Sequence, residues 1–244
     1  SKAAADTLKR VHFELGGKGA NLIFADADDK AVQRGVQHMM QNSGQSCNAP
    51  SRMMVEASVY DSVVEKAAEV AKSVKVGAPS EDGKHIGPVV NAVQYDKIQG
   101  LIETGISEGA RLVAGGPGRP EGFNKGFYVR PTVFADVTPD MTIAREEIFG
   151  PVLSIMKFET EDEAVAVAND TPYGLTNYVQ SQDVERRHRL ARQLRSGMVE
   201  MNGKSRAPGA PFGGMKQSGN GREAGILGIH DFLEVKAVSG WAAE

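Results

Sequence analysis

The chain has 244 residues, 41% of them hydrophobic, and its 28 lysines and arginines against 31 aspartates and glutamates give a net charge of −3. This composition is typical of globular proteins and excludes disordered and fibrous classes. The lack of a basic stripe argues against a nucleic-acid partner. No apolar run approaches the roughly 20 residues of a membrane span, and the N-terminal segment lacks the apolar core of a secretory signal. We therefore expect a cytoplasmic protein with no membrane partner.

Apolar residues recur at helical spacing or in short strand-like runs along the chain. Helices are predicted over residues 30–40, 59–77, 91–109, 160–169 and 183–195. Thr160 and Glu163 have the spacing of a capping box at the start of the fourth. Strands are predicted over residues 52–55, 111–114, 128–134, 152–158, 175–180, 198–201 and 233–238. Strands that alternate with helices predict an α/β fold with a mostly parallel sheet.

The one cysteine, Cys47, lies in the polar loop sequence SGQSCNAP. A single cysteine excludes an intrachain disulfide and argues against a metal site built from cysteines. A lone cysteine is most often a small buried hydrophobic residue. In a polar loop, however, its thiolate could act as a nucleophile once its pKa is lowered. A cysteine protease would also need a paired histidine, and the five histidines are scattered: His12, His38, His85, His188 and His230.

Three further segments carry polar groups that could do chemistry. Glu14 precedes Gly16 and Gly17, so a ligand or a water could approach it closely, although a surface glutamate is the simpler interpretation. Glu146 and Glu147 are adjacent, and such pairs are usually solvated. The glycine-rich segment 212–225 lacks the spacing of a phosphate-binding loop and is interpreted as turns.

Taken together, four motifs resemble the NAD(P)-dependent aldehyde dehydrogenase superfamily. They are ELGGK (14–18), GQSC (44–47), EEIFGPV (146–152) and PFGGMKQSG (211–219), and they occur in the family's order and with family-like spacing. The resemblance runs from about residue 5 to the C-terminus. It implies the three-layer α/β/α catalytic domain of that family, with a C-terminal strand that extends a neighbouring subunit's sheet.

The resemblance also implies a mechanism and assigns residues to it. Cys47 would attack an aldehyde, hydride would leave to NAD or NADP, and Glu14 would activate a water to hydrolyse the resulting thioester. The presence of Glu14 favours a free acid as product over transfer to coenzyme A or phosphate. The remaining matches are to cofactor-binding and substrate-pocket residues: Glu147, Phe149, Leu15 and Gly16 for the cofactor, and Ser46, Asn48 and Phe212 for the pocket.

Members of this superfamily are about twice as long, and their N-terminal half supplies most of the cofactor site. We therefore expect residues 1–16 to be a remnant of the cofactor-binding domain, 17–229 the catalytic domain, and 230–244 an oligomerisation strand and tail. As a truncated catalytic domain, the chain should bind NAD poorly and oxidise aldehydes negligibly by itself. The whole protein is expected to be a homodimer or homotetramer.

Two other functions stay open at this point. The chain could be a binding or structural domain without catalysis. It could also be a thiol esterase that uses Cys47 and Glu14 without a cofactor. The sequence does not indicate which aldehyde is the substrate, and the choice between NAD and NADP depends on residues outside this chain.

Overall fold

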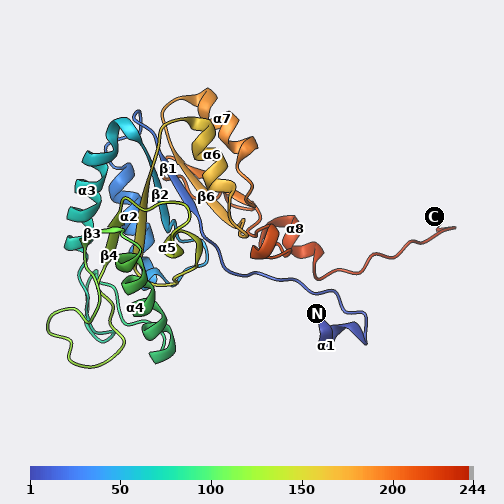
Figure 1. The fold of residues 1–244 in the computed structure, drawn as a ribbon. Coiled ribbons are helices and arrows are strands. Elements are labelled where there is room, and N and C mark those ends of the chain that lie inside the picture. Colours follow the sequence, from blue (N-terminus) through green and yellow to red (C-terminus); the bar gives the residue numbers. More distant parts are fainter. Residues whose placement is uncertain (242–244) are drawn as a thin grey trace.

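A seven-stranded sheet runs through the middle of the molecule (Figure 1). The computed structural model describes residues 1–241. The strands lie in the order β3-β4-β5-β2-β1-β6-β7, and every pairing is parallel except that of β3 with β4. Their bounds are β1 Ala20–Ile23, β2 Arg52–Glu56, β3 Arg111–Ala114, β4 Thr132–Ala135, β5 Val152–Phe158, β6 Thr176–Gln180 and β7 Met198–Met201. The predicted mostly parallel α/β sheet is confirmed.

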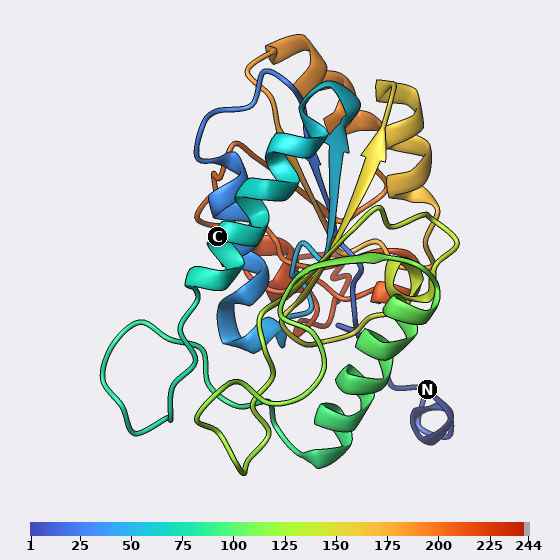
Figure 2. The same ribbon diagram turned by 60° about the vertical axis from the view of Figure 1, so that its left-hand side comes forward.

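Helices cover both faces of the sheet, so that the fold has three layers (Figure 2). On one face lie α2 (Ala31–Met40) and α3 (Tyr60–Ser73). On the other lie α4 (Ala92–Ser107), α5 (Thr142–Arg145), α6 (Glu161–Asn169) and α7 (Val184–Gln193). Each face has its own apolar cluster, and strands β1, β4 and β6 are buried along their whole length. Continuous burial is typical of parallel strands that are covered on both sides.

Short elements complete the chain. They are α1 (Lys2–Ala5), α8 (Gly225–His230) and the single-turn 3₁₀ helices η1 (Gln41–Gly44), η2 (Ala57–Val59) and η3 (Lys216–Ser218). None of the described helices is long and apolar enough to cross a membrane.

The sequence did not predict the central strand β1. Its four residues, ANLI, are too few to show a period, and one of them, Asn21, is polar yet only 1% exposed. The structure explains this burial, because the Asn21 side-chain oxygen accepts a hydrogen bond from Gln180 Nε2 on the neighbouring β6 at 3.1 Å. Only the sheet topology brings these two side chains together.

Two predicted elements end differently in the structure. The strand predicted over residues 128–134 begins only at Thr132, because Pro131 has no N–H to donate to a neighbouring strand. The helix predicted over residues 59–77 ends at Ser73. The predicted helix cap is confirmed, since Thr160 Oγ1 accepts a hydrogen bond from the Glu163 N–H at 3.2 Å.

The two terminal segments extend away from the sheet on the same side of the molecule (Figure 1). Arg10 joins them, donating to the Leu233 carbonyl at 2.9 Å and pairing with Glu234 at 3.1 Å. The strand predicted over residues 233–238 is not formed in the described structure. This segment lies beyond the edges of the sheet, and Val235 is 97% exposed, so within residues 1–241 it has no strand to pair with. Its role in oligomerisation stays a prediction.

Candidate active site

Cys47 lies on a tight loop that follows α2. Asn42 and Ser43 adopt left-handed φ values of 50° and 56°, and Gly44 follows at 71°, so the chain reverses within three residues. The Asn42 side chain stabilises the turn by donating to the Gln45 carbonyl at 2.8 Å. Ser43 Oγ fixes it to the neighbouring loop by donating to the Gly87 carbonyl at 2.7 Å. The loop therefore holds Cys47 partly buried in a defined position.

Two glycines let three of the sequence motifs approach one another. A Cβ on Gly17 would overlap the Cys47 carbonyl oxygen, and a Cβ on Gly44 would overlap the carbonyl of Gly150. Only glycine tolerates such close backbone contact, and Gly44 also needs its positive φ. The ELGGK, GQSC and EEIFGPV segments are thus packed backbone against backbone around Cys47.

The fourth motif holds Glu14 in place. Residues 12–15 are extended alongside residues 218–221, with an antiparallel bridge between Glu14 and Gly219. The Leu15 N–H donates to the Ser218 carbonyl at 3.0 Å, and the Asn220 side chain accepts from the Phe13 N–H at 2.9 Å. The glycine-rich segment therefore forms turns, as predicted, and these turns carry the backbone of the candidate base.

The Glu14 carboxylate faces a cavity of about 640 Å³. Both of its oxygens are buried, and neither has a hydrogen-bond partner among the described residues. Burial raises the pKa of Glu14, and the nearby Glu223 raises it further, against the opposing effect of Arg222. A desolvated carboxylate with a raised pKa and free lone pairs is suited to take a proton from water.

The environment of the Cys47 thiol also disfavours charge. Burial raises the pKa of Cys47, and the carboxylates of Glu147 and Glu14 add to this increase, while hydrogen bonds from the Asn48 and Cys47 backbone N–H groups oppose it. Since both carboxylates act on the thiol, all three groups lie in one electrostatic environment.

Glu147 and Phe149 lie beside the ELGGK segment. Glu147 Oε1 accepts a hydrogen bond from the Gly17 N–H at 2.9 Å, and the second oxygen lies where a Cβ on Gly16 would be. Lys97 Nζ donates to the Glu147 carbonyl at 2.7 Å. Burial raises the pKa of the Glu147 carboxyl, against the Gly17 hydrogen bond and the charges of Lys97 and Lys18. Phe149 has a left-handed φ of 55°, and its carbonyl accepts from the Gln94 side chain.

The remaining predicted site residues lie beside different parts of the site. Leu15, next to Glu14, is 48% exposed, so its apolar side chain is accessible to a ligand or to another surface. Ser46 and Asn48 flank Cys47, and the Asn48 carbonyl accepts from the Tyr178 hydroxyl at 2.6 Å. Phe212 pairs with Glu223 through two backbone hydrogen bonds of 2.7 Å, and Glu223 lines the cavity that Glu14 faces.

Sequence reasoning assigned no role to Lys18, the buried last residue of the ELGGK motif. Lys18 is only 2% exposed, and its Nζ has no hydrogen-bond partner among the described residues. Burial lowers its pKa to about 7, assisted by the nearby Arg52 and opposed by Glu147. Thr176 Oγ1 is also buried without a partner, and both residues line the same small cavity. Lysines are rarely fully buried, so no sequence pattern indicated this one.

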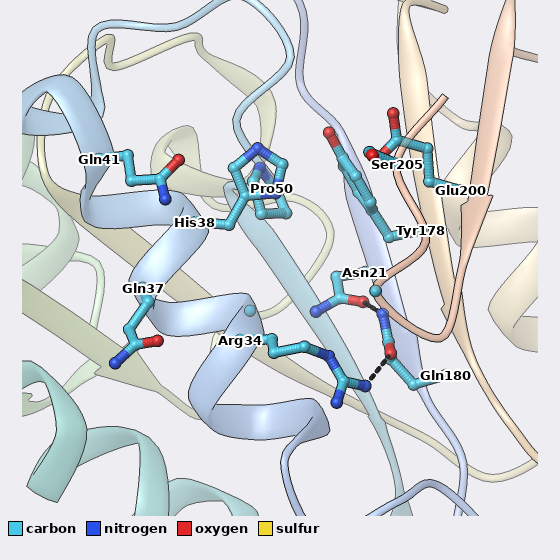
Figure 3. A pocket seen from close by; sticks show the side chains of 12 residues that line it. Asn21, Arg34, Gln37, His38, Gln41, Pro50, Tyr178, Gln180, Glu200 and Ser205 are labelled. Atoms are coloured by element: carbon cyan, nitrogen blue, oxygen red, sulfur yellow. Dashed lines mark hydrogen bonds between the residues drawn. The ribbon is translucent and has the colours of Figure 1, made fainter. Parts of the chain in front are cut away.

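A polar cleft of about 370 Å³ between α2 and the β1–β6–β7 end of the sheet was also missed (Figure 3). His38 packs edge-to-face on Tyr178 with ring centroids 5.2 Å apart, and Tyr178 links the cleft to the Cys47 loop through Asn48. Figure 3 shows Arg34 reaching Gln180 at one end of this cleft. Within residues 1–241, no three His, Cys, Asp or Glu side chains are arranged to hold a metal ion.

Comparisons with known proteins agree with this geometry. The model of the "Aldehyde dehydrogenase family" matches residues 1–238. An aldehyde dehydrogenase from Bartonella henselae is 61% identical, with a TM-score of 0.97 over 98% of this chain and 50% of its own. A mutant of aldehyde dehydrogenase C from Pseudomonas syringae, solved with NAD⁺ and octanal, is 50% identical, with a TM-score of 0.95 over 100% of this chain and 50% of its own.

Among curated proteins, a 3-succinoylsemialdehyde-pyridine dehydrogenase from a Pseudomonas species is 52% identical over 242 residues, which are 99% of this chain and 51% of that protein. The chain thus spans about half the length of the relatives it matches. Its fold, its four motifs and these similarities agree with one another, and the chain belongs to the aldehyde dehydrogenase family.

Proposed function

We propose that this chain carries the nucleophile and the water-activating base of an enzyme that oxidises an aldehyde to a carboxylic acid. The observation that supports this proposal is the packing of three motifs around Cys47, while the fourth holds Glu14, whose carboxylate has no hydrogen-bond partner among the described residues and acts on the same thiol. Cys47 loses its thiol proton to solvent and Sγ attacks the aldehyde carbon; loss of a hydride, for which a bound nicotinamide cofactor would be the acceptor, would then leave a thioester. Glu14 then takes a proton from a water, the resulting hydroxide attacks the thioester carbonyl, and the C–S bond breaks to return the thiolate.

The cofactor-facing residues fit a nicotinamide cofactor. Gly16 lets the Glu147 carboxylate lie against the backbone, because a Cβ there would overlap Oε2, and Oε2 accepts no hydrogen bond from the described residues. A ribose hydroxyl could therefore donate to this oxygen. NAD, or alternatively NADP, supplies the hydride acceptor when it is bound. Glu147, Phe149, Leu15 and Gly16 would hold its nicotinamide end, and we expect the rest of its site in sequence that this chain does not span.

We propose a small aldehyde as substrate, with Ser46, Asn48 and Phe212 in the pocket wall. One relative is named for a pyridine semialdehyde and one solved structure holds octanal. These two compounds share the aldehyde and little else, so they support no narrower class. A cytoplasmic location, a homodimeric or homotetrameric whole protein, and the division into segments 1–16, 17–229 and 230–244 are likewise proposals.

A second candidate function follows from the same pair of residues. Attack of Cys47 on an activated ester and hydrolysis of the acyl-enzyme by Glu14 need no cofactor, so the 244-residue chain itself could be a slow thiol esterase. This reaction shares its second half with aldehyde oxidation. It therefore gives access to the role of Glu14 without NAD.

The test uses this shared step. The chain is acylated with p-nitrophenyl acetate, excess reagent is removed, and loss of the acetyl group from Cys47 is followed by intact mass. We expect Glu14→Gln to lengthen the lifetime of the thioester by about 100-fold, and Cys47→Ser to prevent its formation. Equal lifetimes in the wild-type chain and in Glu14→Gln would show that Glu14 is not the base, and would leave a non-catalytic role as the better interpretation.

A further inference from the structure

The base must lose its proton before the next turnover, and the structure indicates a route. This argument rests on the proposed role of Glu14. We propose that His12, oriented by Asp231, relays the proton from Glu14 to solvent. His12 was one of the scattered histidines that the sequence did not connect to any site.

The first observation is the backbone geometry. Residues 12–15 are extended, as the hydrogen bonds of Phe13 and Leu15 to the glycine-rich segment show. On an extended segment, side chains two residues apart point to the same side. His12 and Glu14 therefore share a face, and both line the cavity of about 640 Å³.

The second observation is that the buried Glu14 carboxylate points into this shared space. Glu14 Oε1 lies 2.8 Å from the position of a Cβ on Gly213 and 3.5 Å from that of a Cβ on Gly221, and the Cβ of His12 lies 3.3 Å from the same position on Gly221. Gly221 thus leaves room between the carboxylate and the histidine, and Gly213 leaves room beside the carboxylate. Neither Glu14 oxygen has a hydrogen-bond partner among the described residues.

The third observation is the position of Asp231. Its Oδ2 lies 2.9 Å from His12 Nδ1, which leaves Nε2 as the ring nitrogen that can accept a proton. A carboxylate beside the opposite ring nitrogen stabilises the imidazolium that forms. The His12 side chain is 37% exposed, so the proton can pass on to bulk water.

The other charged groups of the cavity are less suited to this role. Arg222 is permanently protonated and cannot accept a proton. Glu223 is a carboxylate whose charge raises the pKa of Glu14, so it favours retention of the proton on Glu14. The two side chains share no hydrogen bond, so in the proposed step a water in the cavity takes the proton as the Glu14 O–H bond breaks and gives one of its own protons to His12 Nε2. The imidazolium then releases its proton to bulk water.

The experiment compares single-turnover loss of the Cys47 acetyl group with multiple-turnover hydrolysis of p-nitrophenyl acetate by the 244-residue chain. We expect His12→Gln and Asp231→Asn to slow multiple-turnover hydrolysis by about 10-fold and to leave the single-turnover loss of the acetyl group unchanged, because the relay acts after the thioester is hydrolysed. His230→Gln is the matched control, because this histidine is on the neighbouring α8 and does not line the cavity. Exogenous imidazole should restore the rate of His12→Ala, a rescue that a purely structural histidine would not give.

The outcomes separate this inference from the proposed function. Slow deacylation in Glu14→Gln together with a wild-type multiple-turnover rate in His12→Gln would overturn the relay and leave the base intact. A slowed His12→Ala that imidazole does not rescue would overturn it as well, as would an effect confined to Glu223→Gln. Asp231→Asn provides the test if the His12 variants fail to fold by circular dichroism.

Discussion

Lys18 offers the sharpest test of the structure, because a fully buried ammonium without a partner destabilises the fold. We expect Lys18→Met to stabilise the chain near neutral pH. Methionine keeps the length of the side chain and removes the charge. Lys18 is 2% exposed and lies between Gly17 and the buried strand β1, so the substituted side chain occupies the same enclosed space.

The magnitude follows from the pKa. The pKa of Lys18 falls from 10.5 to about 7 on folding. This shift lowers the free energy of unfolding of the chain by about 5 kcal/mol at pH values below about 7. Between the two pKa values the unfolded chain binds the proton and the folded chain does not, so the free energy of unfolding rises with pH. Below about pH 7 Lys18 is protonated in both states, and the loss of stability is constant. Above pH 10.5 Lys18 is neutral in both states, and the loss disappears.

Urea denaturation of the wild-type chain and of Lys18→Met, at about pH 6.5 and about pH 9.5, measures this difference. We expect the variant to be more stable at the lower pH, by up to about 5 kcal/mol less a contribution from the lost attraction to Glu147, and the gap to narrow at the higher pH. Lys66→Met is the control, since the Lys66 side chain is 52% exposed. A gap that does not depend on pH, or a variant less stable at both pH values, would refute the burial of a charged Lys18.

Two further predictions concern the supports of the site. Gly44→Ala should lower the free energy of unfolding by about 3 kcal/mol, because a Cβ there meets both a left-handed φ and the Gly150 carbonyl. Arg52→Met should cost about 3 to 5 kcal/mol, because the buried guanidinium donates to the carbonyls of Lys18, Val167 and Ala168 at 2.9 to 3.0 Å. Urea denaturation checks both.

Matched controls exist for each of these variants. Gly100→Ala, in the middle of α4 with open space around its Cβ, should be neutral or stabilising by up to about 1 kcal/mol. Arg189→Met removes an exposed ion pair with Glu161 and should cost less than about 1 kcal/mol. If Gly44→Ala is no worse than Gly100→Ala, the close packing of the Cys47 loop on Gly150 is wrong. If Arg52→Met is no worse than Arg189→Met, the buried hydrogen bonds of Arg52 contribute nothing.

The sequence predicted five main helices and six strands at about their observed places, because hydrophobic patterns are local. It did not predict β1, whose Asn21 is satisfied only by Gln180 from a strand more than 150 residues away. The segment 233–238 shows the opposite error. Its apolar alternation predicts a strand, but a strand needs a neighbour, and none lies beside it in the described structure.

The candidate site residues could be predicted from residue identity and from the order of the motifs. Cys47, Glu14 and Glu147 could be named from the sequence, since the four motifs that contain them resemble one family. The sequence could not show that Gly44 and Gly17 are the contacts that bring these motifs together, nor that Lys18 is buried without a partner. Those facts depend on which backbones meet in the folded chain.

The sequence by itself thus determined the fold class, the family and the candidate nucleophile and base, because each is encoded in local pattern or residue type. Only the tertiary structure decided the environment of those groups. Desolvation sets the pKa of Cys47, Glu14 and Lys18, and desolvation is a property of packing. The juxtaposition of His12 with Asp231, which are 219 positions apart in the printed sequence, arises in the same way, from the fold of two distant segments onto each other.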